Sequence, residues 1–118
     1  MNVRLATLFT LVAAVAASPV FADARGDAKA LVDFGIGAAQ RGLWREAIFR
    51  WEQACQTDPT YAAAFNDLAI AYEHEGQFTK ARKAYEKALE LDPNNSQIQQ
   101  NFDLFKEIND RSSTGKDK

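Results

Sequence analysis

At residues 62–95 the chain reads AAAFNDLAIAYEHEGQFTKARKAYEKALELDPNN, and residues 28–61 carry the same frame as AKALVDFGIGAAQRGLWREAIFRWEQACQTDPTY. Each copy carries an Asp-Pro pair near its end, Asp58-Pro59 and Asp92-Pro93, and the distance between the two prolines sets the repeat period (93 − 59 = 34). Ten positions are identical between the copies: Ala28/Ala62, Ala30/Ala64, Asp33/Asp67, Ile36/Ile70, Gly42/Gly76, Ala47/Ala81, Glu52/Glu86, Ala54/Ala88, Asp58/Asp92 and Pro59/Pro93. Chance does not produce agreement of this kind, so the chain contains an internal repeat.

Each copy reads as two helices joined by a short turn. Gly42 and Gly76 stand where the first helix must stop, because glycine adopts positive φ at little cost. Pro59 and Pro93 close the second helix, because proline cannot continue a helix and disfavours the α conformation in the residue before it. The pattern predicts an all-α fold, with helices of roughly 12 to 15 residues and short connections.

A period of about 34 residues with paired helices is the signature of the tetratricopeptide repeat, written W-x2-L-G-x2-Y, then A-x3-F, then a closing P. The second copy matches it with Phe65, Leu68, Ala69, Tyr72, Ala81, Tyr85, Ala88 and Pro93, and the first with Leu31, Phe34, Gly35, Ala38, Ala47, Trp51, Ala54 and Pro59. The chain therefore resembles a tetratricopeptide repeat protein. The resemblance implies a short α-solenoid of two helix-turn-helix repeats, residues 28–61 and 62–95.

Large and small side chains alternate in this frame as a packed helix pair requires. Gly35 and Ala69 stand where the two helices of a pair approach most closely, so a small side chain is needed there. The alanines of the second helix are expected to do the same. The large residues expected to fill the gaps are Phe34, Trp51, Phe65, Leu68, Tyr72, Phe78 and Tyr85, while Trp44 and Phe78 are expected to close the turns.

Beyond Pro93 the sequence predicts one more amphipathic helix, over residues 96–109. Asn95 or Ser96 supplies the N-cap, and Ile98, Phe102 and Phe105 recur at helical spacing. This segment is either a capping helix for the second repeat or the first helix of a partial third repeat. Residues 110–118 contain no apolar side chain, so a disordered tail is expected there.

Residues 1–22 have the composition of a secretory signal peptide. Arg4 gives a positive start, residues 5–17 are mostly apolar, and Val20 and Ala22 are small residues of the kind that a signal peptidase reads. Cleavage after Ala22 predicts a periplasmic or secreted protein without stable membrane insertion, followed by a linker over residues 23–27. An uncleaved membrane anchor is the weaker alternative, because Ser18 and Pro19 interrupt a run that needs ~18 or more apolar residues to span a bilayer.

No catalytic, cofactor or metal site is predicted. The formal net charge of this chain is −2, and its basic and acidic residues are interspersed, so nucleic acid is not an expected partner. The single histidine, His74, and the single cysteine, Cys55, fall in different repeats, and no glycine-rich phosphate loop exists. We expect a non-enzymatic protein in which Cys55 is a small buried hydrophobe, with a free, reactive or intermolecularly paired thiol as the alternative.

The resemblance also implies a binding surface. In tetratricopeptide repeat proteins the first helix of each pair lines a concave side, and partners bind there as extended peptides or helices. By that resemblance the inner face carries Val32, Ile36, Ala39, Gln40, Asn66, Asp67, Ile70, Glu73, His74, Gln97, Asn101, Leu104 and Glu107. His74 is expected to be a solvated residue of this face rather than a metal ligand or catalytic group.

Two features of this predicted face bear on the partner. Ile36, Ile70 and Leu104 recur one period apart and predict an aliphatic ridge that continues to Val32, unless neighbouring helices partly bury it. Family members that clamp a C-terminal carboxylate use lysine, asparagine and arginine. The matching positions here hold Val32, Ile36, Asp67, Gln97 and Asn101, so an apolar segment is expected instead.

The leading hypothesis from the sequence is an exported adaptor that binds a peptide or helical segment of a protein partner and helps to assemble or tether an envelope complex. A small structural subunit held permanently in a larger complex is the first alternative. A redox factor that depends on Cys55 is the second. Because two repeats give a small core with an exposed inner face, homodimerisation is a further hypothesis.

Overall fold

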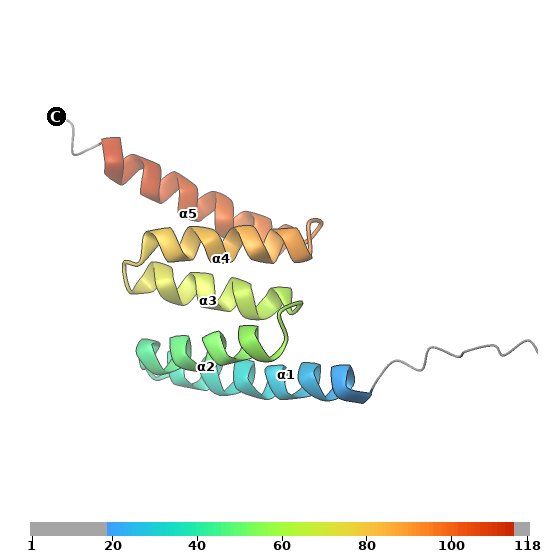
Figure 1. Ribbon diagram of the computed structural model, residues 1–118. Coiled ribbons are helices and arrows are strands. Elements are labelled where there is room, and N and C mark those ends of the chain that lie inside the picture. The colour runs from blue at the N-terminus through green and yellow to red at the C-terminus, as the bar shows by residue number, and fades with distance from the viewer. Residues whose placement is uncertain (1–18, 115–118) are drawn as a thin grey trace, which may run out of the picture.

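The computed structural model describes residues 19–114, and the side chains of residues 23–111. Five helices follow one another in this part of the chain: α1 (Pro19–Gln40), α2 (Trp44–Thr57), α3 (Ala62–His74), α4 (Phe78–Leu91) and α5 (Ser96–Thr114). Consecutive helices run antiparallel and stack into one elongated array (Figure 1). The predicted all-α fold of helix-turn-helix repeats is confirmed.

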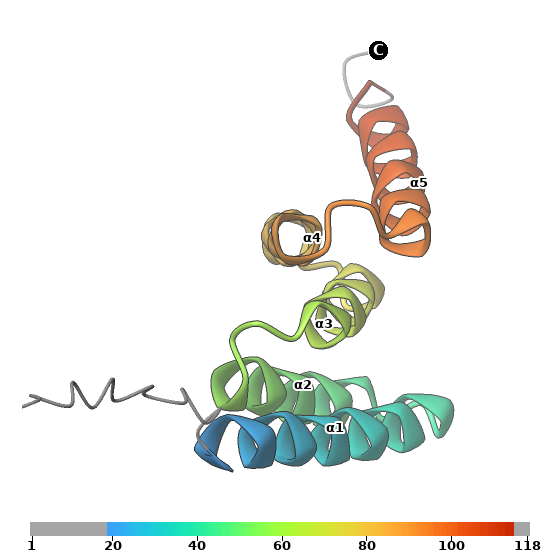
Figure 2. The same cartoon turned by 90° about the vertical axis from the view of Figure 1, so that its right-hand side faces the viewer.

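The array twists as it rises. In Figure 2 the axes of α1 and α2 lie across the view, α4 is seen almost end-on, and α5 stands steeply. Each helix packs against the next, and α3 also contacts α1 and α5. The first helices of the successive pairs therefore adjoin one another, which is the arrangement that a helical solenoid needs to present one continuous inner side.

Both turns within the pairs close in the same way. Gly42 has φ 77° and Gly76 has φ 73°. Around Gly42, the Leu43 amide donates to the Ala38 carbonyl at 2.9 Å and the Gly42 amide donates to the Ala39 carbonyl at 2.9 Å. This pair of bonds is a Schellman motif, and it recurs at Gly76. The predicted role of these two glycines is confirmed.

The core consists of small residues on facing helices with a few large side chains between them. Within the described range, nine alanines are completely buried: Ala28, Ala38, Ala47, Ala54, Ala64, Ala69, Ala71, Ala81 and Ala88. Trp51 and Tyr85 lie among them at 4% and 1% exposure. An alanine-type Cβ placed on Gly35 would lie 2.7 Å from Trp51 Cδ1 and Cε2, so the indole occupies the space that glycine leaves open.

Two aromatic residues predicted for the core are exposed instead. Phe34 is 48% exposed and Phe78 is 46% exposed. The Arg50 guanidinium lies over the Phe34 ring, 4.4 Å from its centroid, and Phe78 packs at an angle against Phe105 with 6.3 Å between ring centroids. The prediction was wrong because the periodic pattern identifies the large residues of the frame but not how deeply the neighbouring helices cover each ring.

The predicted N-terminal boundary also differs from the structure. Residues 23–27, expected as a linker, lie inside α1, which begins at Pro19. Arg25 ties this segment to the second helix of the pair and the turn after it: its guanidinium forms an ion pair with Asp58 and lies over the Tyr61 ring, 4.5 Å from the centroid. The expected signal peptide falls on residues 1–22, of which residues 1–18 lie outside the described part of the chain.

The last helix starts where the sequence places it and runs further than predicted. The Asn95 side-chain oxygen accepts hydrogen bonds from the amides of Gln97 and Ile98, each at 3.1 Å, and so caps α5. Residues 110–114, predicted as part of a disordered tail, are helical, whereas residues 115–118 are outside the described range. Among residues 19–114, no helix is both long and apolar enough to cross a membrane.

Candidate protein-binding cleft

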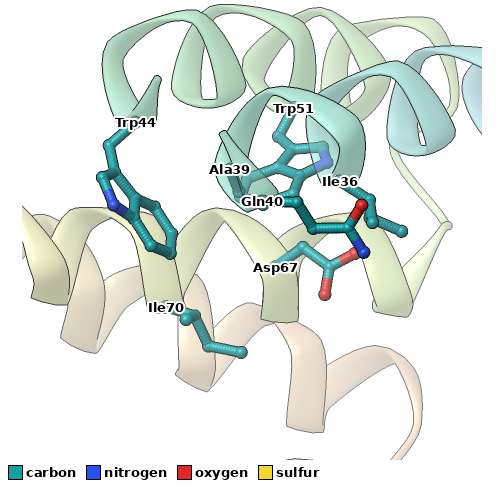
Figure 3. Close-up of a pocket in the computed structure, with 7 residues that line it drawn as sticks. All are labelled: Ile36, Ala39, Gln40, Trp44, Trp51, Asp67 and Ile70. Carbon is teal, nitrogen blue, oxygen red and sulfur yellow. The ribbon is translucent and has the colours of Figure 1, made fainter. Parts of the chain in front are cut away.

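A cleft of about 300 Å³ opens between the first two helix pairs. Its lining comes from three helices: Ile36, Ala39 and Gln40 from α1, Trp44 and Trp51 from α2, and Asp67 and Ile70 from α3 (Figure 3). Gln40 extends from α1 toward the side of α3 that carries Asp67, while Trp44 stands apart from them above Ile70 (Figure 3). The cleft is therefore an apolar recess with one carboxylate and one amide in its wall.

The repeat itself brings the aliphatic walls together. Ile36 and Ile70 occupy the same position on α1 and α3, and these helices adjoin. Ile36 is 39% exposed and Ile70 is half-buried. Exposed apolar side chains that converge in a recess are what a ligand site for an apolar group requires, in contrast to the isolated exposed apolar residues found on any surface.

The two tryptophans hold fixed positions. The Trp51 indole N–H donates to the Val32 carbonyl at 3.1 Å, which satisfies the buried polar end of the ring. The Trp44 ring stacks on the His74 ring, with centroids 4.0 Å apart and planes inclined by 17°. His74 keeps a side-chain exposure of 52%, so the stacked pair forms a flat aromatic edge beside the cleft.

Asp67 is the one carboxylate among the lining residues. Burial raises its pKa to about 6 from an ordinary value of 3.8, although a hydrogen bond with the Asn66 side chain acts in the opposite direction. Asn66 is in turn bonded from α5, because the Asn101 side-chain amide donates to the Asn66 side-chain oxygen at 3.2 Å. Asn101, Asn66 and Asp67 thus form a polar connection from α5 to the cleft.

This partly buried carboxylate predicts a stability difference that depends on pH. The folded chain holds the Asp67 proton up to about pH 6, whereas the unfolded chain loses it near pH 4. The contribution of Asp67 to the free energy of unfolding therefore falls as the pH rises between those values. The shift corresponds to ~3 kcal/mol at most, and partial exposure reduces the expected effect to about 1–2 kcal/mol. We expect Asp67→Asn to raise the free energy of unfolding at pH 7.5 by that amount.

Urea denaturation of the unmodified chain and of Asp67→Asn, at pH 4 and pH 7.5, measures this difference in the free energy of unfolding. The advantage of Asp67→Asn should shrink toward zero at pH 4, where the aspartate is protonated in the folded protein. Asp33→Asn, at the equivalent and exposed position of the first repeat, is the matched control and should change little at either pH. An equal effect of the two substitutions would contradict the role assigned to burial.

The remaining residues predicted for the inner face are dispersed. Val32 is 5% exposed and belongs to the core, so its predicted place on an exposed ridge was wrong. Asn66 is 8% exposed and bonded to Asn101 as described, and Glu73 accepts a hydrogen bond from the Tyr85 hydroxyl at 3.0 Å. Gln97 and Leu104 are exposed on α5, but neither lines the cleft. Of the predicted inner-face residues, the structure therefore gathers five in the cleft lining, with His74 at the edge: Ile36, Ala39, Gln40, Asp67 and Ile70.

The tryptophans are the part of the site that sequence reasoning missed. Trp51 was expected only as a core residue and Trp44 only as the closure of a turn, yet both line the cleft. A signal for Trp44 exists, since it follows the turn at Gly42 in the slot that Phe78 fills one period later. Which side chain its ring meets depends on the angle between the helix pairs, which the pattern does not give.

The chemistry of the described residues offers no metal site and a poorly reactive thiol. No group of three or more His, Cys, Asp or Glu side chains converges within the described range. Cys55 is 9% exposed, and burial, followed by the nearby carboxylates of Asp67 and Glu52, raises the pKa of its thiol to about 12. A thiol of that kind is a packing group, since the thiolate is the reactive form.

The second helix pair carries the recognisable sequence. Residues 62–95 match the tetratricopeptide repeat. This match covers α3, α4 and the turn that follows, which includes Asp67, Ile70 and His74. With the confirmed arrangement of paired helices, the described fold is a tetratricopeptide-like helical repeat.

Several curated proteins are similar to this chain over 64% of its length. The type IV pilus assembly protein PilF of Pseudomonas aeruginosa is 32% identical over 76 residues, which is 64% of this chain and 30% of that protein. A small glutamine-rich tetratricopeptide repeat-containing protein of Mycosarcoma maydis is 32% identical over 76 residues, or 64% of this chain and 22% of its own length. The TPR repeat-containing protein YpiA of Bacillus subtilis is 28% identical over 76 residues, covering 64% of this chain and 18% of its own. The chain thus spans less than a third of the length of these relatives.

Proposed function

We propose that this protein is an adaptor for protein–protein interaction, and that it binds a peptide or helical segment of its partner on the side where α1, α3 and α5 adjoin. The observation that supports this most directly is the cleft between α1 and α3, which is lined by two isoleucines and two tryptophans. Similarity to tetratricopeptide repeat proteins supports the same conclusion, because repeat proteins of this architecture use their concave side as an extended binding surface.

The cleft favours a bulky apolar side chain as the anchor of the bound segment. Ile36 and Ile70 supply contact area, Trp51 forms a rigid wall, and the Trp44–His74 pair offers a flat ring on which a side chain can lie. Asp67 is placed to accept a hydrogen bond from a backbone amide or a basic side chain next to that anchor. An acidic C-terminus would instead bring a second negative charge against Asp67, which is unfavourable.

The adaptor role is non-enzymatic in this proposal, and the place of action is the periplasm or the exterior of the cell. The apolar N-terminal sequence with the small residues Val20 and Ala22 supports export by a cleaved signal peptide. Similarity to a protein named for type IV pilus assembly supports a role in assembling or tethering an envelope complex. An uncleaved N-terminal segment that anchors the protein in the membrane is the alternative.

Other roles differ from this one in measurable ways. A small subunit held permanently in a larger complex would use the same cleft, and the two roles differ in whether free protein exists, which size-exclusion chromatography of native extract reveals. Self-association through the inner face would give a dimer by light scattering. A redox function of Cys55 is not supported, because its thiol is buried and its pKa is raised.

Substitution within the cleft tests the proposed role. Ile70→Asp places a charge in the apolar wall, so we expect it to abolish capture of the partner from native extract, an effect of at least about 2 kcal/mol, which is roughly 30-fold in affinity. Helical content by circular dichroism should stay unchanged. Because Ile70 is half-buried, Ile36→Asp serves as a second variant at the more exposed wall.

The matched control is Phe49→Asp. Phe49 is 52% exposed on α2 and does not line the cleft, so the same exchange of an apolar for an acidic side chain should leave capture intact. If both cleft variants retain the proteins that the unmodified chain captures, binding at the cleft is excluded. Equal loss in all three variants would point to a general effect of charge rather than to this site.

A further inference from the structure

A second groove lies between α3 and α4 and shares no residue with the cleft described above. Its volume is about 300 Å³, and its lining consists of Phe65, Leu68 and Tyr72 from α3 with Lys80, Lys83, Ala84 and Lys87 from α4. We call it the lysine groove. An apolar floor beside a row of lysines is a different chemistry from the cleft, whose one charged lining residue is an aspartate.

The lysines form one row because of their spacing. Lys80, Lys83 and Lys87 stand at positions i, i+3 and i+7 of α4, which places them on one face of that helix over a rise of about 10 Å. The Lys87 ammonium pairs with Glu90 at 3.2 Å, and the Lys80 ammonium lies 5.6 Å from the centroid of the Tyr72 ring. Within residues 23–111 Lys83 has no ion-pair partner. Of the three ammonium groups, only that of Lys87 is therefore paired with a carboxylate in the described part of the chain.

The floor of the lysine groove is apolar and fixed. Leu68 is 6% exposed, Tyr72 is 8% exposed and Phe65 is half-buried. The Tyr72 hydroxyl donates to a Glu52 carboxylate oxygen at 2.6 Å, which anchors the ring from the α2 side. Because these side chains are already held in place, a bound group would lose little of its binding energy to reorganisation of the floor.

We propose that the lysine groove docks an acidic amphipathic helix of a partner protein, with apolar side chains against Phe65 and Tyr72 and carboxylates spaced to meet Lys80, Lys83 and Lys87. Because the three side chains are positively charged, charge complementarity requires a negatively charged ligand. The spacing of the lysines along α4 matches carboxylates at i, i+3 and i+7 of a helix that lies alongside. The proposal does not depend on occupancy of the cleft.

The shape of the groove selects a polypeptide over a lipid surface. Binding to a bilayer requires apolar side chains that protrude beyond the basic ones, as on an amphipathic interfacial helix. Here Leu68 and Tyr72 lie at the bottom of a recess and cannot reach the acyl region, whereas a helix side chain can enter it. With an apolar cleft that holds one carboxylate between α1 and α3 and a basic groove between α3 and α4, one copy of the chain has surfaces for two different segments.

The test uses the full chain and a fluorescein-labelled peptide of about 20 residues, long enough to form an isolated helix, with a leucine stripe flanked by glutamates at i, i+3 and i+7. Fluorescence anisotropy at low salt should show saturable binding in the micromolar range, about −8 kcal/mol. The variant with Lys80→Glu, Lys83→Glu and Lys87→Glu should lose at least about tenfold in affinity. The triple lysine-to-glutamine variant, which perturbs the fold less, should show an intermediate loss.

The controls separate this groove from other surfaces. Lys29→Glu, at an exposed lysine of α1, and Ile70→Asp, in the cleft, should both bind the peptide as the unmodified chain does. The proposal is overturned if the peptide does not saturate below about 1 mM, if the triple glutamate variant binds equally well, or if a peptide with glutamine in place of glutamate binds as tightly. Binding through these lysines to phosphatidylglycerol vesicles but not to the peptide would also overturn it.

Discussion

Replacing Gly35 with alanine is expected to lower the free energy of unfolding by about 2–4 kcal/mol. The new Cβ would lie 2.7 Å from two carbons of the Trp51 indole, which is much closer than van der Waals contact. The ring cannot simply turn away, because it is 4% exposed among buried alanines and its N–H is bonded to the Val32 carbonyl. Either α1 moves away from α2 or the buried hydrogen bond breaks, and both cost stability.

Gly37→Ala is the matched control for this prediction. Gly37 lies two positions further along α1, and a Cβ there would meet nothing within 4 Å. Because alanine favours helix over glycine by about 1 kcal/mol, Gly37→Ala should leave stability unchanged or raise it. Urea denaturation followed by circular dichroism in the far ultraviolet measures both. Similar free energies of unfolding for the two variants would show that the predicted steric conflict with Trp51 does not lower stability.

Replacing Phe105 with alanine is expected to cost about 3–5 kcal/mol and to release α5 from the rest of the fold. Phe105 is 1% exposed, and its ring lies 5.5 Å from the Tyr85 ring and 6.3 Å from the Phe102 ring, centroid to centroid. These three rings lie at the contact between α4 and α5. Since α5 is the last helix of the described stack, no described helix on its other side would hold it in place.

Hydrogen exchange distinguishes release of α5 from general unfolding. In Phe105→Ala, amides of residues 96–114 should exchange fastest, while those of α2 and α3 keep more of their protection. Leu104→Ala is the control, because Leu104 is the preceding residue and is 57% exposed, so its loss should change stability by less than about 1 kcal/mol. Uniform loss of protection along the chain would show that α5 does not open separately.

The helices and turns could be predicted from the sequence because local rules determine them. Gly42 and Gly76 adopt positive φ, and Asn95 caps α5, each from its own chemistry. The N-terminal boundary could not be predicted. In the folded chain Arg25 pairs with Asp58, which lies 33 residues away, and a contact at that separation cannot be read from the local pattern around residues 23–27.

The candidate site was predictable only where the repeat alone places residues. Ile36 and Ile70 share a slot, so their convergence follows from the period. Val32 was misplaced, because its side chain is buried in the core and its carbonyl accepts a hydrogen bond from the Trp51 N–H of α2. Asn66 and Asn101 were expected to face a partner, yet each bonds the other across α3 and α5. Side-chain pairing across helices depends on interhelical angles, which the repeat pattern does not specify.

We expect the bond between Asn101 and Asn66 to link the docking of α5 to the proton of Asp67. Asn101 orients the Asn66 amide, and Asn66 contacts the carboxylate, so the arrangement that favours one charge state of Asp67 also favours one placement of α5. Such a dependence is mutual. A ligand that takes hold of Asp67 from the cleft would therefore change the affinity of the last helix for the stack, and a protein that grips α5 would change the affinity of the cleft.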